Sequence, residues 1–162
     1  MALNRFPADV KAIVVPGTAS GAYASGDQIG TPFEIKSAVL DSGGIATVAS
    51  VAILDVAKQD QAVDIVFFSQ QPSTGTDNSA WNPSAADLAM ILGSAKILTT
   101  SYSDGSSRSV GTVGNIGLKV KPEKATASQS NTSVWGLLVS RGTPNYGASA
   151  PTLSVRIGLQ QD

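Results

Sequence analysis

Short apolar runs, many of them rich in β-branched residues, recur along the chain and are separated by Gly, Pro, Asn, Asp and Ser. Such runs with turn residues between them predict β-strands. The runs cover residues 11–15, 33–39, 45–57, 64–69, 96–100, 110–121, 134–140 and 153–159. Strands do not alternate with long helices, so we expect an all-β protein, a β-sandwich or jelly roll of about eight or nine strands.

The last run has the clearest strand pattern. Its apolar residues occupy every second position and are Leu153, Val155, Ile157 and Leu159. Strict alternation of this kind indicates a strand with one face in the core. We therefore expect the C-terminal strand to be central to folding. Residues 110–120 are also expected to form a strand, with the side chains of all even-numbered positions on one face.

Residues 64–69 have the sequence DIVFFS and are apolar on both faces of the expected strand. Ile65 and Phe67 lie on one face, and Val66 and Phe68 lie on the other. A strand of this kind is covered on both sides. One face is expected to meet the core, and the other requires a helix, a loop or another subunit. Because one sheet core cannot cover this much apolar surface, the strand favours an oligomer, with a trimer expected.

One short helix is expected over about residues 83–92. Asn82 or Ser84 can cap its start, and Asp87 lies near the positive end of the helix dipole. Gly93 stands where a helix commonly ends. The apolar face of this helix would comprise Leu88, Ile91 and Leu92, at the spacing i, i+3 and i+4.

The chain has 162 residues, which is a common size for one domain. We expect a single β-sandwich domain over residues 11–162 and an N-terminal arm over residues 1–10. Pro7 stops a helix or a central strand from continuing through the arm. The candidate interface residues of the arm, which combine apolar surface with one charge, are Leu3, Arg5 and Phe6.

Charge is scarce in this chain. Charged residues make up 14% of it, against about 25% in a typical soluble domain, and the formal net charge is -1. This balance does not attract nucleic acid or an anionic membrane, so neither is an expected partner. With 16 glycines and many Ala, Ser and Thr residues, the composition indicates a surface covered by neighbouring molecules. The alternative is a tight β-protein with a surface rich in Ser and Thr.

Histidine and cysteine are both absent from the sequence. Their absence excludes disulfides, zinc sites built on Cys or His, and catalysis by Ser-His-Asp or Cys-His arrangements. The sequence also has no GxxxxGK[ST] phosphate-binding loop and no GxGxxG segment that opens a helix. We therefore expect no enzymatic activity, no metal and no cofactor.

Paired carboxylates are the remaining option for catalysis. Asp55, Asp60 and Asp64 flank one connection, with Lys58 between them. Aspartate is also a common turn residue, and we favour a role in solvating a hairpin tip. Calcium binding by Asp55, Asp60 or Asp77 lacks the spacing of an EF-hand loop.

Lys119, Lys121 and Lys124 form a small basic cluster. The cluster has no interleaved aromatic residues, on which the bases of single-stranded nucleic acids stack. A solvated strand face or a contact with an acidic partner is therefore the expected role.

Two aromatic residues lie in polar loops. Trp81 lies in TGTDNSAWNPS, and Tyr146 lies in TPNYGAS. Each is either a loop anchor that folds over the edge of the core or an interface residue, since Trp and Tyr are enriched at protein contacts. We retain both as candidate interface residues.

Five segments of the chain together resemble a known group of proteins. They are YASGDQIG (23–30), ATVASVAILD (46–55), DIVFFSQQPSTGTDNSAWNPSAADLAMILG (64–93), SRGTPNY (140–146) and LSVRIGLQQD (153–162). In this order they span most of the chain. The chain resembles small virion structural proteins of tailed bacteriophages, of the capsid decoration or cement type.

This resemblance implies a protein that binds the outer surface of an icosahedral shell, commonly as a trimer at local three-fold positions. The implied partners are the major capsid protein and further copies of the chain itself. The implied location is the capsid surface of the virion, after assembly in the host cytoplasm. In agreement, the start of the chain lacks the apolar core of a secretory signal, and no stretch approaches the roughly 18 apolar residues of a membrane span.

The residues leave a second class of function open. A carbohydrate- or receptor-binding module of a phage fibre or tail would have the same jelly-roll fold. Exposed aromatic side chains beside polar groups in a shallow groove would distinguish such a module from a capsid protein. Trp81 and Tyr146 are the candidates for these side chains.

Removal of residues 1–7 tests the arm. A segment this short is frayed unless a partner orders it, so its removal should leave the melting temperature nearly unchanged. Attachment to the shell should weaken, because the contacts of the ordered arm are lost. Equal capsid binding by the truncated and full-length chains would contradict the arm, and failure to fold would place the segment in the core.

Overall fold

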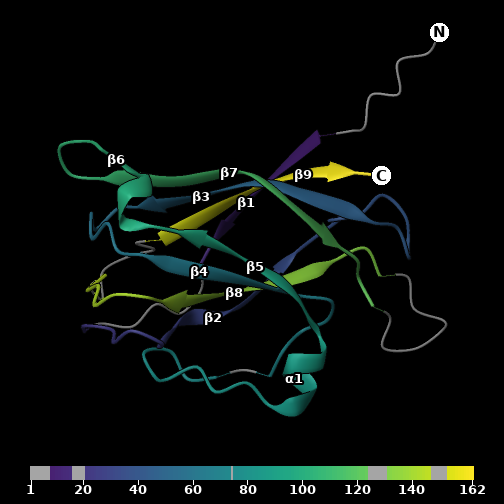
Figure 1. The fold of residues 1–162 in the computed structure, drawn as a ribbon, viewed down its shortest axis with the longest axis horizontal. Helices are drawn as coiled ribbons and strands as arrows, with labels where there is room; N and C mark the ends of the chain where they lie inside the picture. Colours follow the sequence, from purple (N-terminus) through teal and green to yellow (C-terminus); the bar gives the residue numbers. More distant parts are fainter. Residues whose placement is uncertain (1–7, 16–20, 74, 124–130, 147–152) are drawn as a thin grey trace, which may run out of the picture.

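The computed structural model describes residues 8–15, 21–73, 75–123, 131–146 and 153–162. Within them, nine strands form two antiparallel sheets that pack face to face (Figure 1). The five-stranded sheet has the order β1 (Ala8–Val14), β9 (Leu153–Gln161), β3 (Ala46–Asp55), β7 (Ser109–Val120) and β6 (Tyr102–Asp104). The four-stranded sheet has the order β2 (Gln28–Ile35), β8 (Val134–Ser140), β4 (Val63–Phe68) and β5 (Ile91–Ile97). The expected all-β sandwich is confirmed.

The strand order follows from nested pairing of the two halves of the chain. β1 pairs with β9, β2 with β8, β3 with β7, and β4 with β5, all antiparallel. A long hairpin of four strand pairs, rolled into two layers, has this order, which is that of a jelly roll. The short β6 is an extra strand beside β7, and a 3-10 turn (Thr99–Ser101) leads into it from β5.

The C-terminal strand β9 lies inside the five-stranded sheet, between β1 and β3. Its apolar side chains are all buried, and they are Leu153, Val155, Ile157 and Leu159. They belong to one core cluster with side chains of the four-stranded sheet, such as Ile65 and Phe67. The expected core face of the last strand is confirmed, and its importance for folding stays a prediction.

β7 does not keep the same set of positions towards the core along its length. Ala49 of β3 lies opposite three residues of β7, 115–117, two of which have positive φ angles. At this bulge the two faces of β7 change places. Before the bulge an odd-numbered residue, Val113, packs against the core, and after it an even-numbered residue, Leu118, does so. The prediction that all even positions of this strand share one face is therefore wrong. Val110, on the outer face, is 38% exposed.

The helix is shorter than expected. α1 spans Ala85–Ala89 and not residues 83–92. Ser84, one of the two expected caps, accepts a hydrogen bond from a backbone N–H of the first turn. Ile91 already begins β5, because pairing with β4 takes up the residues from there on. Leu88 is 55% exposed, so the expected apolar helix face does not form.

β1 begins at Ala8, within the region expected to form the N-terminal arm. Residues 8–10 pair with β9, so they belong to the sheet and the arm does not extend to residue 10. The candidate interface residues Leu3, Arg5 and Phe6 lie outside the described residues.

The substitution Ile157→Ala should destabilise the protein by about 2–5 kcal/mol, because it leaves a cavity where a side chain is fully buried. Gln160→Ala, at an exposed position of the same strand, is the control and should change stability little. Urea unfolding of both variants measures the two free energies. A loss of stability for Ile157→Ala no larger than that of the control would contradict the central place of β9.

Candidate interaction surfaces

Apolar side chains fill the outer face of the four-stranded sheet as well as its inner face. This outer-face cluster comprises the buried residues Val66, Phe68, Leu137 and Val139 and the partly buried Trp81, Met90, Ile91 and Trp135. Figure 1 shows α1 and the segment around it below the four-stranded sheet, away from the other sheet. The second apolar face of DIVFFS is thus covered by side chains of the same chain, among them Trp81 and Met90. This strand no longer argues for an oligomer, and the trimer stays a prediction.

Trp81 anchors the loop that covers this face. Its backbone N–H donates to the carbonyl of Gly26 at 2.9 Å, and Asp27 forms a β-bridge with Ala80. The side chain packs against the outer-face cluster and is partly buried. Of the two interpretations of Trp81, these contacts support the loop anchor.

Tyr146 lies in the core and not on the surface. It is 2% exposed and meets the ring of Tyr23 edge-on, with 5.8 Å between the ring centroids. Burial raises the pKa of the Tyr146 hydroxyl well above its ordinary value of 10.0. Its expected place among the candidate interface residues is corrected, because a side chain in the core cluster cannot reach a partner.

A buried carboxylate holds the covering loop in place. Asp87 accepts hydrogen bonds from the backbone N–H of Ser73 at 2.7 Å and from that of Ser84 at 2.9 Å. Both serine hydroxyls also donate to it. The hydrogen bond from the Ser73 hydroxyl is the largest of the effects that hold the pKa of Asp87 well below its usual range. Asp87 thereby ties the start of α1 to the segment that follows β4.

The three aspartates considered for catalysis have structural partners. Asp55 accepts hydrogen bonds from three backbone N–H groups of the loop that follows it, at 2.7, 2.9 and 3.2 Å. Burial raises the pKa of Asp55, against the effect of these hydrogen bonds. Asp60 accepts a hydrogen bond from the Ser109 hydroxyl. Asp64 pairs with Arg141 at 2.8 Å.

The expected role in solvating a hairpin tip does not fit Asp55 and Asp64, which are buried, and the contacts of Asp55 and Asp60 instead hold the loop between β3 and β4. Within the described ranges, no group of three or more acidic side chains is placed to hold calcium or another metal ion. Of the basic cluster, Lys119 pairs with Asp162 at 3.0 Å, Lys121 is exposed, and Lys124 lies outside the described residues. No helix in the described part of the chain is long and apolar enough to cross a membrane.

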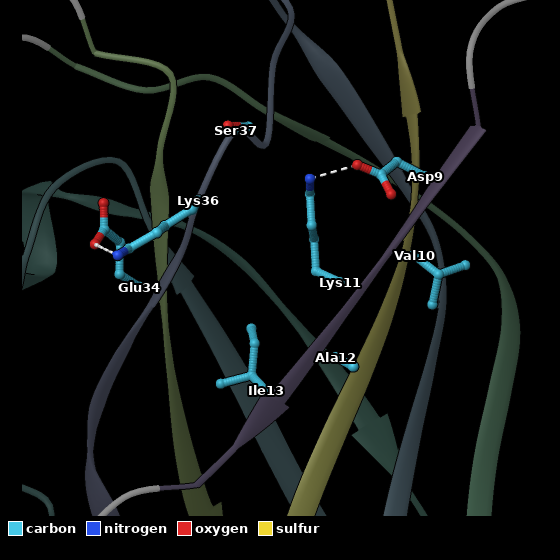
Figure 2. A pocket seen from close by; sticks show the side chains of 8 residues that line it. All are labelled: Asp9, Val10, Lys11, Ala12, Ile13, Glu34, Lys36 and Ser37. Carbon is cyan, nitrogen blue, oxygen red and sulfur yellow. Dashed lines mark ion pairs between the residues drawn. The ribbon is translucent and has the colours of Figure 1, made fainter.

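A groove of about 350 Å³ runs along the side of the sandwich where the edge strands β1 and β2 lie. The charged residues of this edge groove are Asp9, Lys11, Glu34 and Lys36 (Figure 2). Lys11 pairs with Asp9. Lys36 pairs with Glu34 at 4.0 Å, so both lysines already have a carboxylate partner. Asp9 and Lys11 lie opposite the buried Leu159 and Ile157 and so on the inner face of the edge strand β1. Inward charges at an edge strand deter further strands from adding to the sheet.

The outer face of the five-stranded sheet is not covered by any element that the structure describes (Figure 1). The middle of this surface, which we call the open face, comprises Val10, Ala12, Ser50, Ala52, Thr112, Gly114, Arg156 and Gly158. Figure 2 shows Val10 and Ala12 on the side of β1 opposite to Lys11 and Ile13. Arg156 alone among these residues is charged, so the open face is a nearly neutral surface.

Sequence reasoning missed the open face. Its residues come from four strands that are far apart in the sequence, and each looks like an ordinary outward position of its own strand. One feature of the sequence could have indicated it. In the runs 45–57 and 153–159, many of the residues between the apolar positions are small. Only the pairing register shows that these positions adjoin.

No protein-family model matches the chain, and no curated protein matches it in sequence. Among solved structures, the VP2 subviral particle of infectious bursal disease virus is similar at 11% sequence identity and a TM-score of 0.29. The match covers 94% of this chain and 37% of that chain, so this chain spans little more than a third of that protein. A similarity this low carries no argument about family or function.

The substitution Asp87→Asn should lower the free energy of unfolding by about 1–3 kcal/mol at neutral pH, because an amide cannot accept all the hydrogen bonds that the carboxylate accepts. The folded protein lowers the pKa of Asp87, so its contribution is present above the ordinary value of 3.8 and is lost as the pH falls from there towards the lowered pKa. The difference between wild type and variant should therefore shrink below pH 3.8.

Urea unfolding across this pH range measures the difference. The exposed Asp41→Asn serves as the control for the loss of one surface charge. A difference for Asp87→Asn that stays constant with pH would show that the carboxylate does not hold the loop.

Proposed function

We propose that this protein is a virion structural protein that binds the outer surface of a bacteriophage capsid and stabilises the shell, as decoration or cement proteins do. The open face carries the proposal, because an uncovered and nearly neutral sheet surface is suited to contact with another protein. The resemblance of five ordered segments to that group of proteins supports it. The major capsid protein is the proposed partner, and the capsid surface of the virion is the proposed location.

The contacts of the acidic residues in the described part of the chain favour a protein that acts by binding over an enzyme. Acid–base catalysis by carboxylates requires two of them facing one cleft. Asp55 and Asp60 instead hold a loop, and Asp64 is in an ion pair. With no histidine or cysteine in the sequence, we propose no catalytic residue.

A carbohydrate- or receptor-binding module is less well supported. Ligand pockets of this kind present aromatic side chains beside a few polar groups. The large hydrophobic side chains that are exposed in the described residues are Val10, Leu40, Ile45, Val56, Leu88, Leu98 and Val110, and none is aromatic. Trp81 covers the outer-face cluster and Tyr146 is buried, so neither is presented to a sugar.

The proposed oligomer is a homotrimer, on the basis of the resemblance. A capsid offers a repeating lattice of equivalent sites, and linked binding modules gain avidity on such a lattice without any new contact. A trimer would therefore attach firmly even where each copy contributes a small contact.

Co-sedimentation with capsids that were produced without this protein tests the proposed function. Added protein should sediment with the capsids until the sites are saturated, and it should raise the temperature at which the shells break. Image reconstruction of the decorated particles should show added density on the outer surface. Absence of binding would contradict the proposal, and binding to a glycan array in its place would favour the carbohydrate-binding alternative.

A further inference from the structure

The open face consists of two rows of residues that run across the strands. The first row contains Val10, Gly158, Ser50 and Gly114, on β1, β9, β3 and β7. The second row contains Ala12, Arg156, Ala52 and Thr112, on the same four strands. Residues that pair across antiparallel strands point to the same face of the sheet. The two rows therefore form one continuous surface.

The first row lines a hollow of about 410 Å³, together with Ala52, Thr112 and Arg156 of the second row. Two members of the first row are glycines and a third is a serine, so their side chains fill little of the hollow. A Cβ added to Gly114 would meet nothing within 4 Å, which shows that the space above it is open. A Cβ added to Gly158 would meet the Ser50 hydroxyl, which would have to turn away, while Ser50 Cβ lies 3.7 Å from it at an ordinary contact distance.

Arg156 lines the hollow and carries the charge of the open face. Its side chain is exposed, and it has no ion-pair partner among the residues that the structure describes. Of the other described lysines and arginines, carboxylates pair with Lys11, Lys36, Lys58, Lys119 and Arg141 but not with Lys96, Arg108 and Lys121. A guanidinium bordered by small uncharged residues has its charge available to a ligand, and a carboxylate matches its geometry best.

The size and charge of this face limit what can occupy it. With four strands about 4.8 Å apart and two rows of residues that each cover about 6.6 Å along the strands, the face measures roughly 250 Å². A standard protein interface buries about 800 Å² on each partner, so one copy alone would bind weakly. A second copy docked face to face would bring another unpaired arginine to the same contact, and like charges repel. The occupant that fits is a different protein, bound at many equivalent places.

We propose that the open face binds a protein surface from which an aspartate or glutamate side chain projects into the hollow and pairs with Arg156. The inference rests on the proposed function, in which that surface is the outer surface of the capsid. The glycines and other small residues let the partner approach the sheet closely, and this excludes water from around the ion pair. The other two candidate surfaces offer less to a partner. The charges of the edge groove are already paired, and the outer-face cluster is already covered.

Two substitutions and two matched controls test this inference. Arg156→Glu reverses the charge, and Gly114→Phe fills the hollow. Arg108→Glu makes the same charge change at an exposed arginine beside the turn between β6 and β7, and Ser94→Phe adds the same ring at an exposed position of β5. Circular dichroism and the melting temperature should match the wild type for all four variants, because each site is exposed. Binding to capsids produced without this protein is then measured by co-sedimentation over a range of concentrations.

Arg156→Glu and Gly114→Phe should each weaken capsid binding by about tenfold or more, and the controls should bind within about twofold of the wild type. Wild-type affinity for both test variants would overturn the assignment of the open face and leave the proposed function standing. Normal binding by Arg156→Glu with loss only for Gly114→Phe would overturn the pairing with a carboxylate. Failure of the wild-type protein itself to bind would overturn the proposed function and this inference with it.

Discussion

The insertion of β9 between β1 and β3 is the constraint on which the rest of the structure depends. It pairs the C-terminal strand with the first strand of the sandwich and with the third, so the five-stranded sheet forms only when distant parts of the chain meet. The inward residues of β9, such as Ile157, lie in the core, and its outward residues include Arg156 and Gly158. Because side chains alternate along a strand, the same strand holds the core together and forms the middle of the open face.

The two sheets differ in what their outer faces require. The four-stranded sheet carries large outward side chains such as Phe68 and Leu137, which must be kept from water, and the loop that carries Trp81 packs against them. Asp87 fixes this loop by accepting hydrogen bonds from both sides of it. Most outward residues in the middle of the five-stranded sheet are small, and no element of the described ranges covers them. This difference is the basis of the proposal that the open face binds another protein.

Local patterns predicted much of the fold because they report directly on burial. The alternation in β9, the strand over residues 134–140 and the cap at Ser84 were all predictable in this way. The helix over residues 83–92 was overestimated because a short apolar run does not distinguish one helical turn followed by a strand from a longer helix. The single face expected for β7 failed because a bulge depends on the partner strand, and nothing in residues 110–120 alone shows where Ala49 will lie.

The sequence by itself determined that the chain is all-β, that β9 has a core face, and that histidine and cysteine are missing. Only the tertiary structure decided that the second face of DIVFFS is covered by its own chain and that Tyr146 is buried. It also decided that Gly114 and Arg156 share one surface. The physical reason is that alternation specifies which residues of one strand point the same way, whereas the register between strands specifies which distant residues become neighbours.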